Sequence, residues 1–242
     1  MTNKLNQFTT HSSLFTNFAF TLAETLIVMG IIGVVAALTL PNLNSSTGDK
    51  EKVAKVKKIY SNLQDAFGRA QAVYGPYDEW CINLNTYNCT TRTGERITEF
   101  MKISKICGTS NGCFSNQMIK SMDKIDLDPS FYSNSDCYKI ITADGTSIAF
   151  SQNDISIDID GPNNGINAYC RDLFGFDIRN NSIEPSGIDQ DSSGNISLRT
   201  YYTGTGCTFW IVQNDNMDYL KVDSNGKCAN NIQLSWTNTT CK

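Results

Sequence analysis

Hydrophobic residues are spread unevenly along this 242-residue chain, and their spacing divides it into parts with different periods. In the first part, from Phe20 to Leu40, almost every residue is apolar and only Glu24 is charged. At about 1.5 Å per residue, a helix over this run is roughly 31 Å long, close to the roughly 30 Å hydrocarbon core of a bilayer. The pattern therefore predicts a membrane-spanning helix over residues 20–41.

In the second part, residues 42–75, apolar residues recur every three or four positions and lysines fall mostly between them. The recurring positions are Val53, Val56, Ile59 or Tyr60, Leu63, Phe67, Ala70 and Val73 or Tyr74. This spacing predicts an amphipathic helix, and Gly75-Pro76 is a typical stop signal. The pattern leaves open whether the polar stretch at residues 44–48 breaks the helix.

The third part, residues 76–242, is expected to form a globular head. Residues 77–135 are irregular, apart from helical patterns at Glu95 to Ile106 and Asn116 to Ile125. From Cys137 onward apolar residues alternate, and Asp144-Gly145 is a turn dipeptide typical of a hairpin. Strands are predicted at 137–143, 146–152, 155–161, 173–179, 195–202 and 208–213. The predicted fold class is α+β: a long N-terminal helix, its first half spanning the membrane and its second half amphipathic, packed on an antiparallel sheet.

Composition limits the functions that the head can perform. The chain is 40% hydrophobic and 18% charged, which is enough to bury a core. From Ile125 onward, 14 Asp and one Glu stand against seven Lys and Arg, a net charge of −8. This balance disfavours nucleic acid as a partner. Arg92, Arg96, Lys102 and Lys105 could form a basic face. Charges in such a pattern are more often the solvated surface of a helix.

Candidate catalytic chemistry is scarce, and we expect no enzyme. The one histidine, His11, precedes the body of the protein, which excludes Ser-His-Asp triads and histidine-containing zinc sites there. Neither a phosphate-binding glycine loop nor a nucleophile elbow is present. Calcium is the one candidate cofactor. Its candidate oxygen ligands are Asp158, Asp160, Asn163 and Asp172, and a second set is Asp189, Asp191, Ser193 and Gly194, although turn residues that cap strand ends are the better interpretation of both sets.

Nine cysteines begin at Cys81, and none has the spacing of zinc ligands or of a redox Cys-x-x-Cys motif. Disulfides formed in an oxidising compartment are the better interpretation. Cys81 with Cys89 and Cys107 with Cys113 would close short local loops. The connectivity stays open, because even eight cysteines allow 105 pairings, and one cysteine must be left over.

Glu24 needs a compensating partner, because a carboxylate inside an apolar span costs about 2.5 to 3.5 kcal/mol even on a lenient scale. A free α-amino group would supply it if the chain were cut just before Phe20. The alternative is an ordinary secretory signal cut after Val34-Val35-Ala36, but the apolar run is longer than such signals and only Lys4 precedes it.

Over residues 19–43 the sequence resembles the type IV pilin and pseudopilin superfamily. Ala19 and Phe20 match the cleavage site of that family, Glu24 its fifth mature position, and Pro41 its helix-kinking proline. The segments at 158–165 and 171–176 are similar to stretches in the heads of a pilin-like subgroup. The resemblance implies a leader, residues 1–19, which a prepilin peptidase removes before it methylates Phe20. It also implies a disulfide between Cys228 and Cys241 near the C-terminus.

The resemblance implies a structural subunit of a type IV pilus or a type II secretion pseudopilus that polymerises through its N-terminal helix. Its partners would be other subunits, the prepilin peptidase, an inner-membrane assembly platform and, before assembly, membrane lipid. It would be a single-pass protein of the bacterial inner membrane with its head outside, then part of a periplasmic pseudopilus or surface pilus. The alternative is a minor pilin whose head binds a ligand, for DNA uptake or surface adhesion.

One rule opposes that orientation. Five lysines follow the apolar run within about 20 residues and one precedes it, so the positive-inside rule places the head in the cytoplasm. The cysteines and the family resemblance favour the exterior, and we expect the head there.

Overall fold

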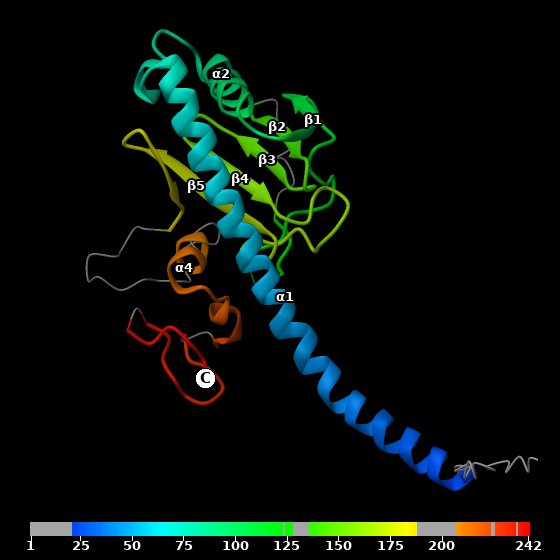
Figure 1. Ribbon diagram of the computed structural model, residues 1–242. Helices are drawn as coiled ribbons and strands as arrows, with labels where there is room; N and C mark the ends of the chain where they lie inside the picture. The colour runs from blue at the N-terminus through cyan, green and yellow to red at the C-terminus, as the bar shows by residue number, and fades with distance from the viewer. Residues whose placement is uncertain (1–20, 123, 128–135, 188–206, 224–225, 236) are drawn as a thin grey trace, which may run out of the picture. The chain divides into compact units, whose positions relative to one another are not determined.

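A computed structural model describes residues 21–122, 124–127, 136–187, 207–223, 226–235 and 237–242, with the backbone alone for residues 36–47. The chain divides into two compact units, residues 1–46 and 47–242, and helix α1 (Leu22–Tyr74) contributes to both. Figure 1 shows α1 and the labelled elements of the head.

Helix α1 is continuous through Pro41 and through the polar stretch at residues 44–48, which settles the question that the sequence left open. It ends at Tyr74, where Gly75 turns into the left-handed region with φ +82° and donates its N–H to the carbonyl of Gln71 at 2.9 Å. Glycine adopts this conformation without a Cβ penalty, and Pro76 cannot continue the helix. The predicted stop signal is therefore used.

The predicted fold class is wrong in its membrane-spanning half. Among the residues that the structure describes, no helix is both long and apolar enough to cross a membrane.

From Val53 onward α1 packs across one face of the sheet (Figure 1). Its apolar stripe is buried as the periodicity predicts, from Val53 to Ala70, while Val73 at the end of the stripe is 62% exposed. The stripe packs in one core with the central strands, and the ring of Tyr60 stacks on Phe176 at 5.4 Å. This burial gives the helix a fixed face toward the head.

The sheet has six antiparallel strands in sequential order, so each strand pairs with the next one along the chain. They are β1 (Ile103–Gly108), β2 (Tyr138–Thr142), β3 (Ser147–Phe150), β4 (Asp154–Asp158), β5 (Leu173–Arg179) and β6 (Ser182–Pro185). The hairpin predicted at Asp144-Gly145 joins β2 and β3, and Gly145 has the positive φ of +88° that this turn requires.

Two local predictions in the head are wrong. The apolar stretch 208–213, predicted as a strand, lies in helix α4 (Cys207–Asn214). Short apolar runs fit both structures, and here Cys207, Trp210 and Ile211 are buried together at helical spacing. The described residues of the helical pattern at Asn116–Ile125 form no helix, and Lys120 forms isolated bridges with Asp126 and Ala168 instead.

The other helical pattern is shifted. Helix α2 (Thr86–Thr98) begins earlier than predicted, because the side chain of Asn85 caps it by accepting the N–H of Asn88 at 2.9 Å. After it the chain extends into β1. Two short 3-10 helices, η1 (Tyr77–Glu79) and η2 (Asp218–Lys221), complete the described elements. The predicted strand at 195–202 lies outside the described residues.

Candidate functional site

The first turn of α1 is closed by a reciprocal pair of hydrogen bonds between Thr21 and Glu24. The Glu24 carboxylate accepts the N–H and the hydroxyl of Thr21, both at 2.9 Å, and the Glu24 N–H donates to the Thr21 hydroxyl at 3.2 Å. This is a capping box, and the backbone N–H of Thr21 lowers the pKa of Glu24. The Thr-x-x-Glu spacing is the sequence signature of such a box, so the role of Thr21 could have been predicted from the sequence. Ala19 and Phe20 lie outside the described residues.

The part of α1 that follows the cap is apolar and uncovered. Nine large hydrophobic side chains between residues 22 and 35 are each 53–78% exposed. They are Leu22, Leu26, Ile27, Val28, Met29, Ile31, Ile32, Val34 and Val35. They point in all directions around the helix, and a soluble monomer rarely exposes so large a contiguous apolar surface. An exposed apolar surface of this kind is typical of sites that contact other proteins or a membrane. Pro41 lies in the helix backbone beyond it.

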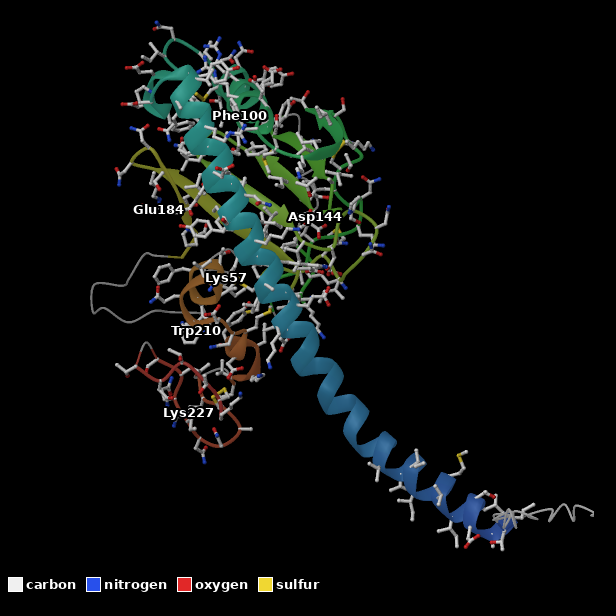
Figure 2. The ribbon with its side chains drawn as sticks, in the orientation of Figure 1. Lys57, Phe100, Asp144, Glu184, Trp210 and Lys227 are labelled. Carbon is white, nitrogen blue, oxygen red and sulfur yellow. A yellow bond between two sulfur atoms is a disulfide. The ribbon has the colours of Figure 1, made fainter. Side chains whose placement is uncertain are left out.

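A row of lysines on α1 contacts the acidic head. The ammonium of Lys57 lies 2.6 Å from Asp215, and that of Lys58 lies 2.7 Å from Asp144. Lys52 and Lys55 lie 3.9 and 3.8 Å from Asp160. Figure 2 labels Lys57 on α1 and Asp144 at the β2–β3 turn. These lysines count against an exterior head under the positive-inside rule, yet their partners give them a structural reason to be there.

The acidic residues proposed as calcium ligands gather in one turn of the head, residues 158–172, which we call the acidic turn. Asp172 accepts three backbone N–H groups, from Ile166 at 2.6 Å, Asn167 at 3.0 Å and Ala168 at 2.7 Å. Asn163, by contrast, is exposed at the surface. Asp172 therefore shapes this turn through the backbone.

Asp158 is buried in the same turn. Its Oδ1 accepts the N–H groups of Asp160 and Gly161, both at 3.1 Å, while its Oδ2 has no hydrogen-bond partner among the described residues. Burial raises the pKa of Asp158 to about 8, and the charges of Asp172 and Asp160 act in the same direction. The side chain therefore holds a proton near neutral pH.

The acidic turn does not fit a calcium site. Calcium takes six to eight oxygen ligands, but both oxygens of Asp172 are taken by backbone N–H groups and Asp160 faces two ammonium groups. Within the described residues no group of three or more acidic, histidine or cysteine side chains is arranged to hold a metal ion. The second candidate set, Asp189, Asp191, Ser193 and Gly194, lies outside those residues.

Four disulfides join described cysteines. Three are the pairs expected from the sequence: Cys81–Cys89, Cys107–Cys113 and Cys228–Cys241. The fourth, Cys170–Cys207, ties the turn before β5 to α4 across 37 residues, and no sequence signal pointed to it. Cys137 takes part in none of these bonds and is buried, where desolvation raises the pKa of its thiol.

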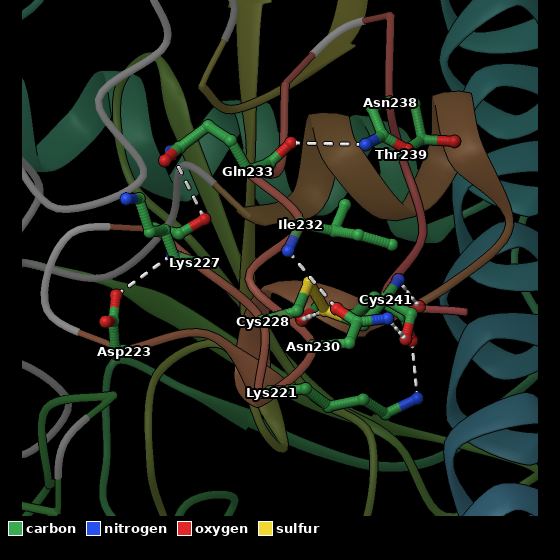
Figure 3. Close-up of a disulfide and its surroundings, with 12 residues drawn as sticks. Lys221, Asp223, Lys227, Cys228, Asn230, Ile232, Gln233, Asn238, Thr239 and Cys241 are labelled. Atoms are coloured by element: carbon green, nitrogen blue, oxygen red, sulfur yellow. Dashed lines mark hydrogen bonds and ion pairs between the residues drawn. A yellow bond between two sulfur atoms is a disulfide. The ribbon is translucent and has the colours of Figure 1, made fainter.

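The C-terminal disulfide is held by polar contacts as well (Figure 3). The buried carboxylate of Asp218 accepts the N–H of Cys241 at 2.7 Å and binds Lys221 at 2.5 Å. Asn230 donates its side-chain amide to the Cys241 carbonyl at 3.3 Å. The chain end is thereby fixed to η2.

The basic face considered for Arg92, Arg96, Lys102 and Lys105 does not form as an open cationic surface. Arg96 lies over the rings of Tyr74 at 4.6 Å and Trp80 at 5.2 Å. Arg92 donates to the carbonyl of Trp80 at 3.4 Å, and Lys105 donates to that of Gly112 at 2.8 Å. Three of the four cations therefore stabilise the fold.

A cleft of about 400 Å³ opens between α1, the α2–β1 connection and the β2–β3 turn. Its apolar side chains include Ile59, Phe100 and Ile148, and its rim carries the Lys58–Asp144 ion pair and Lys102. Arg69 lies over the Phe100 ring at 5.0 Å. The volume lies within the range of small-molecule sites.

Comparisons with protein-family models, with characterised proteins and with solved structures give no significant match.

Proposed function

We propose that this protein is a structural subunit of a type IV pilin-like filament, either a pilus or a type II secretion pseudopilus. Copies join through the N-terminal part of α1, after a prepilin peptidase has cut the chain between Ala19 and Phe20. The other partner is the assembly platform, and the head lies outside the cytoplasm.

The observation that carries this proposal is the apolar surface of residues 22–35. Its nine large side chains are exposed on every side of one helix, so burying them requires several neighbouring helices. A bundle of the same segment from other copies supplies that number of neighbours. The sheet, the disulfides and the packed half of α1 then make a rigid head that each copy displays.

Placing a charge in this surface tests the proposal. We expect Ile31→Asp to abolish recovery of the protein in sheared or pelleted filaments, because a carboxylate in an apolar bundle is strongly unfavourable. Val73→Asp is the matched control, since Val73 is on the same helix and equally exposed, 62% against 60% for Ile31. Filaments should form with the control variant.

Mass spectrometry of the native protein completes the test. The mature chain should begin at Phe20, and the Ile31→Asp variant should be cut at the same bond. A mature chain that begins at Ala37, or filaments that form equally well with both variants, would overturn the proposal.

The alternative is a minor subunit whose head binds a ligand, and the cleft beside α1 is the one observation that favours it. Its apolar lining and its charged rim suit a small organic molecule better than a nucleic acid. Asn62→Trp, at an exposed position of the cleft lining, should obstruct the cleft and abolish ligand binding while filament assembly persists.

A further inference from the structure

We infer that the acidic turn takes its counter-charge from helix α1. The ammonium groups of Lys52 and Lys55 occupy the place of a divalent cation, so that α1 is latched to the head without a metal. This inference concerns the head alone and does not depend on the proposed function.

The carboxylates of the turn are crowded against one another. Gly165, with φ +75°, allows this: a Cβ built on it would lie 2.4 Å from Oδ2 of Asp172 and 3.1 Å from Oδ2 of Asp160. These two oxygens therefore border the same small space beside Gly165, and Asp158 is buried close enough for both charges to act on it. Like charges held this closely require a counter-charge.

Lys52 and Lys55 supply that counter-charge from one face of α1. Residues three apart in a helix are neighbours, so both ammonium groups reach the same carboxylate, Lys52 at Oδ2 and Lys55 at Oδ1 of Asp160. Lys52 also donates to the backbone carbonyl of Arg171 at 2.8 Å. A carboxylate oxygen and a loop carbonyl are the groups that calcium ordinarily binds, and here an ammonium contacts both.

Backbone N–H groups bind most of the other carboxylate oxygens of the turn, and Oδ2 of Asp158 is the exception among the described residues. Asp172 is satisfied by the three backbone N–H groups of residues 166–168, and one oxygen of Asp158 by two more. Two positive charges from the helix together with the backbone amides therefore stabilise the turn. The latch links residues more than a hundred positions apart, which fixes α1 against this end of the head.

Thermal unfolding of the full chain with its disulfides intact tests the latch. The double variant Lys52→Met/Lys55→Met should lower Tm by about 2–6 °C, the range of one or two lost contacts in a domain of this size. In an Asp160→Asn background the same two substitutions should have a smaller effect, because their shared partner is gone and only the hydrogen bond from Lys52 to the Arg171 carbonyl and the ion pair of Lys55 with Glu51 are left to lose.

The matched control is Lys57→Met/Lys58→Met, which removes the same charge from the same helix but from pairs with Asp215 and Asp144. Its effect on Tm should be unchanged by Asp160→Asn. Should either double variant fail to fold, single lysine substitutions give the same comparison.

Calcium provides the opposing measurement. The wild-type Tm should be the same in millimolar calcium and in EDTA, since anything that binds only the folded state raises Tm. A rise in Tm with calcium that Asp160→Asn abolishes would overturn the inference, and so would an effect of Lys52→Met/Lys55→Met that persists undiminished in the Asp160→Asn background.

Discussion

At the residue scale, two carboxylates have local partners that the hydrophobic pattern does not reveal. Glu24 needs no distant counter-ion in the single chain, because Thr21 at the start of α1 binds its carboxylate through two hydrogen bonds. A neighbouring subunit's α-amino group would therefore have to compete with this cap. Asp158 is buried, whereas Glu24 is exposed. Oδ1 of Asp158 accepts two backbone N–H groups, and its Oδ2 has no hydrogen-bond partner among the described residues.

Asp158 makes the stability of the head depend on pH. Its pKa is about 8 in the folded chain against 3.8 for the ordinary side chain, so the folded state binds more protons between these values. The free energy of unfolding should therefore fall as pH rises from about 4 to about 8.

Asp158→Asn should remove this pH dependence, because the amide accepts the same two N–H groups and cannot ionise. We expect the variant to be more stable than wild type at pH 8 by about 2 kcal/mol, or roughly 4–8 °C in Tm, with the difference vanishing near pH 4. Asp78→Asn, at an exposed position, is the control. A variant that is less stable at pH 8 would indicate that Asp158 is charged there.

At the scale of elements, the packing of α2 on the sheet requires a glycine. A Cβ on Gly94 would lie 2.3–2.7 Å from three atoms of Tyr138 in β2, so the helix approaches the strand without room for a side chain. The close approach brings α2 against β2 and β3 and covers this end of the sheet.

Gly94→Ala should destabilise the head by about 1–3 kcal/mol, the usual cost of overpacking. Gly68→Ala is the matched control, since Gly68 is also helical and has nothing within 4 Å of its built Cβ. The control should be neutral or more stable by about 0.5–1 kcal/mol, because alanine favours the helix. Chemical denaturation measures both, and equal effects would contradict the close packing.

At the scale of the whole molecule, four disulfides staple segments of the head that have few strands or helices of their own. Cys81–Cys89 and Cys107–Cys113 close loops beside α2 and β1, while Cys170–Cys207 and Cys228–Cys241 hold α4 and the chain end. Native disulfides in small domains typically contribute about 2–5 kcal/mol each.

We expect a single cysteine, Cys137, to be alkylated when the native protein is denatured without reductant. Before denaturation it should be protected by burial, and after reduction all nine should react. Peptide mapping identifies the labelled residue. If all nine cysteines reacted without reductant, the head would belong to the cytoplasm, in agreement with the count of lysines after the apolar run.

The sequence by itself determined the features that depend on local spacing. The buried stripe of α1 from Val53 to Ala70, its end at Gly75-Pro76, the β2–β3 hairpin and the strand at 173–179 all follow from period and turn chemistry. Three disulfides follow from short separations and the family resemblance, because nearby cysteines meet without help from the fold.

Only the tertiary structure decided the features that join distant segments. Residues 208–213 are apolar enough for a strand, and the burial of Cys207, Trp210 and Ile211 at helical spacing makes them a helix. The lysines of α1 form ion pairs with Asp144, Asp160 and Asp215, and only the folded chain brings these aspartates next to the helix. The sequence of the acidic turn does not reveal whether calcium or lysine ammonium groups balance its charge. The lysines that contact it lie in a helix about a hundred residues earlier in the chain.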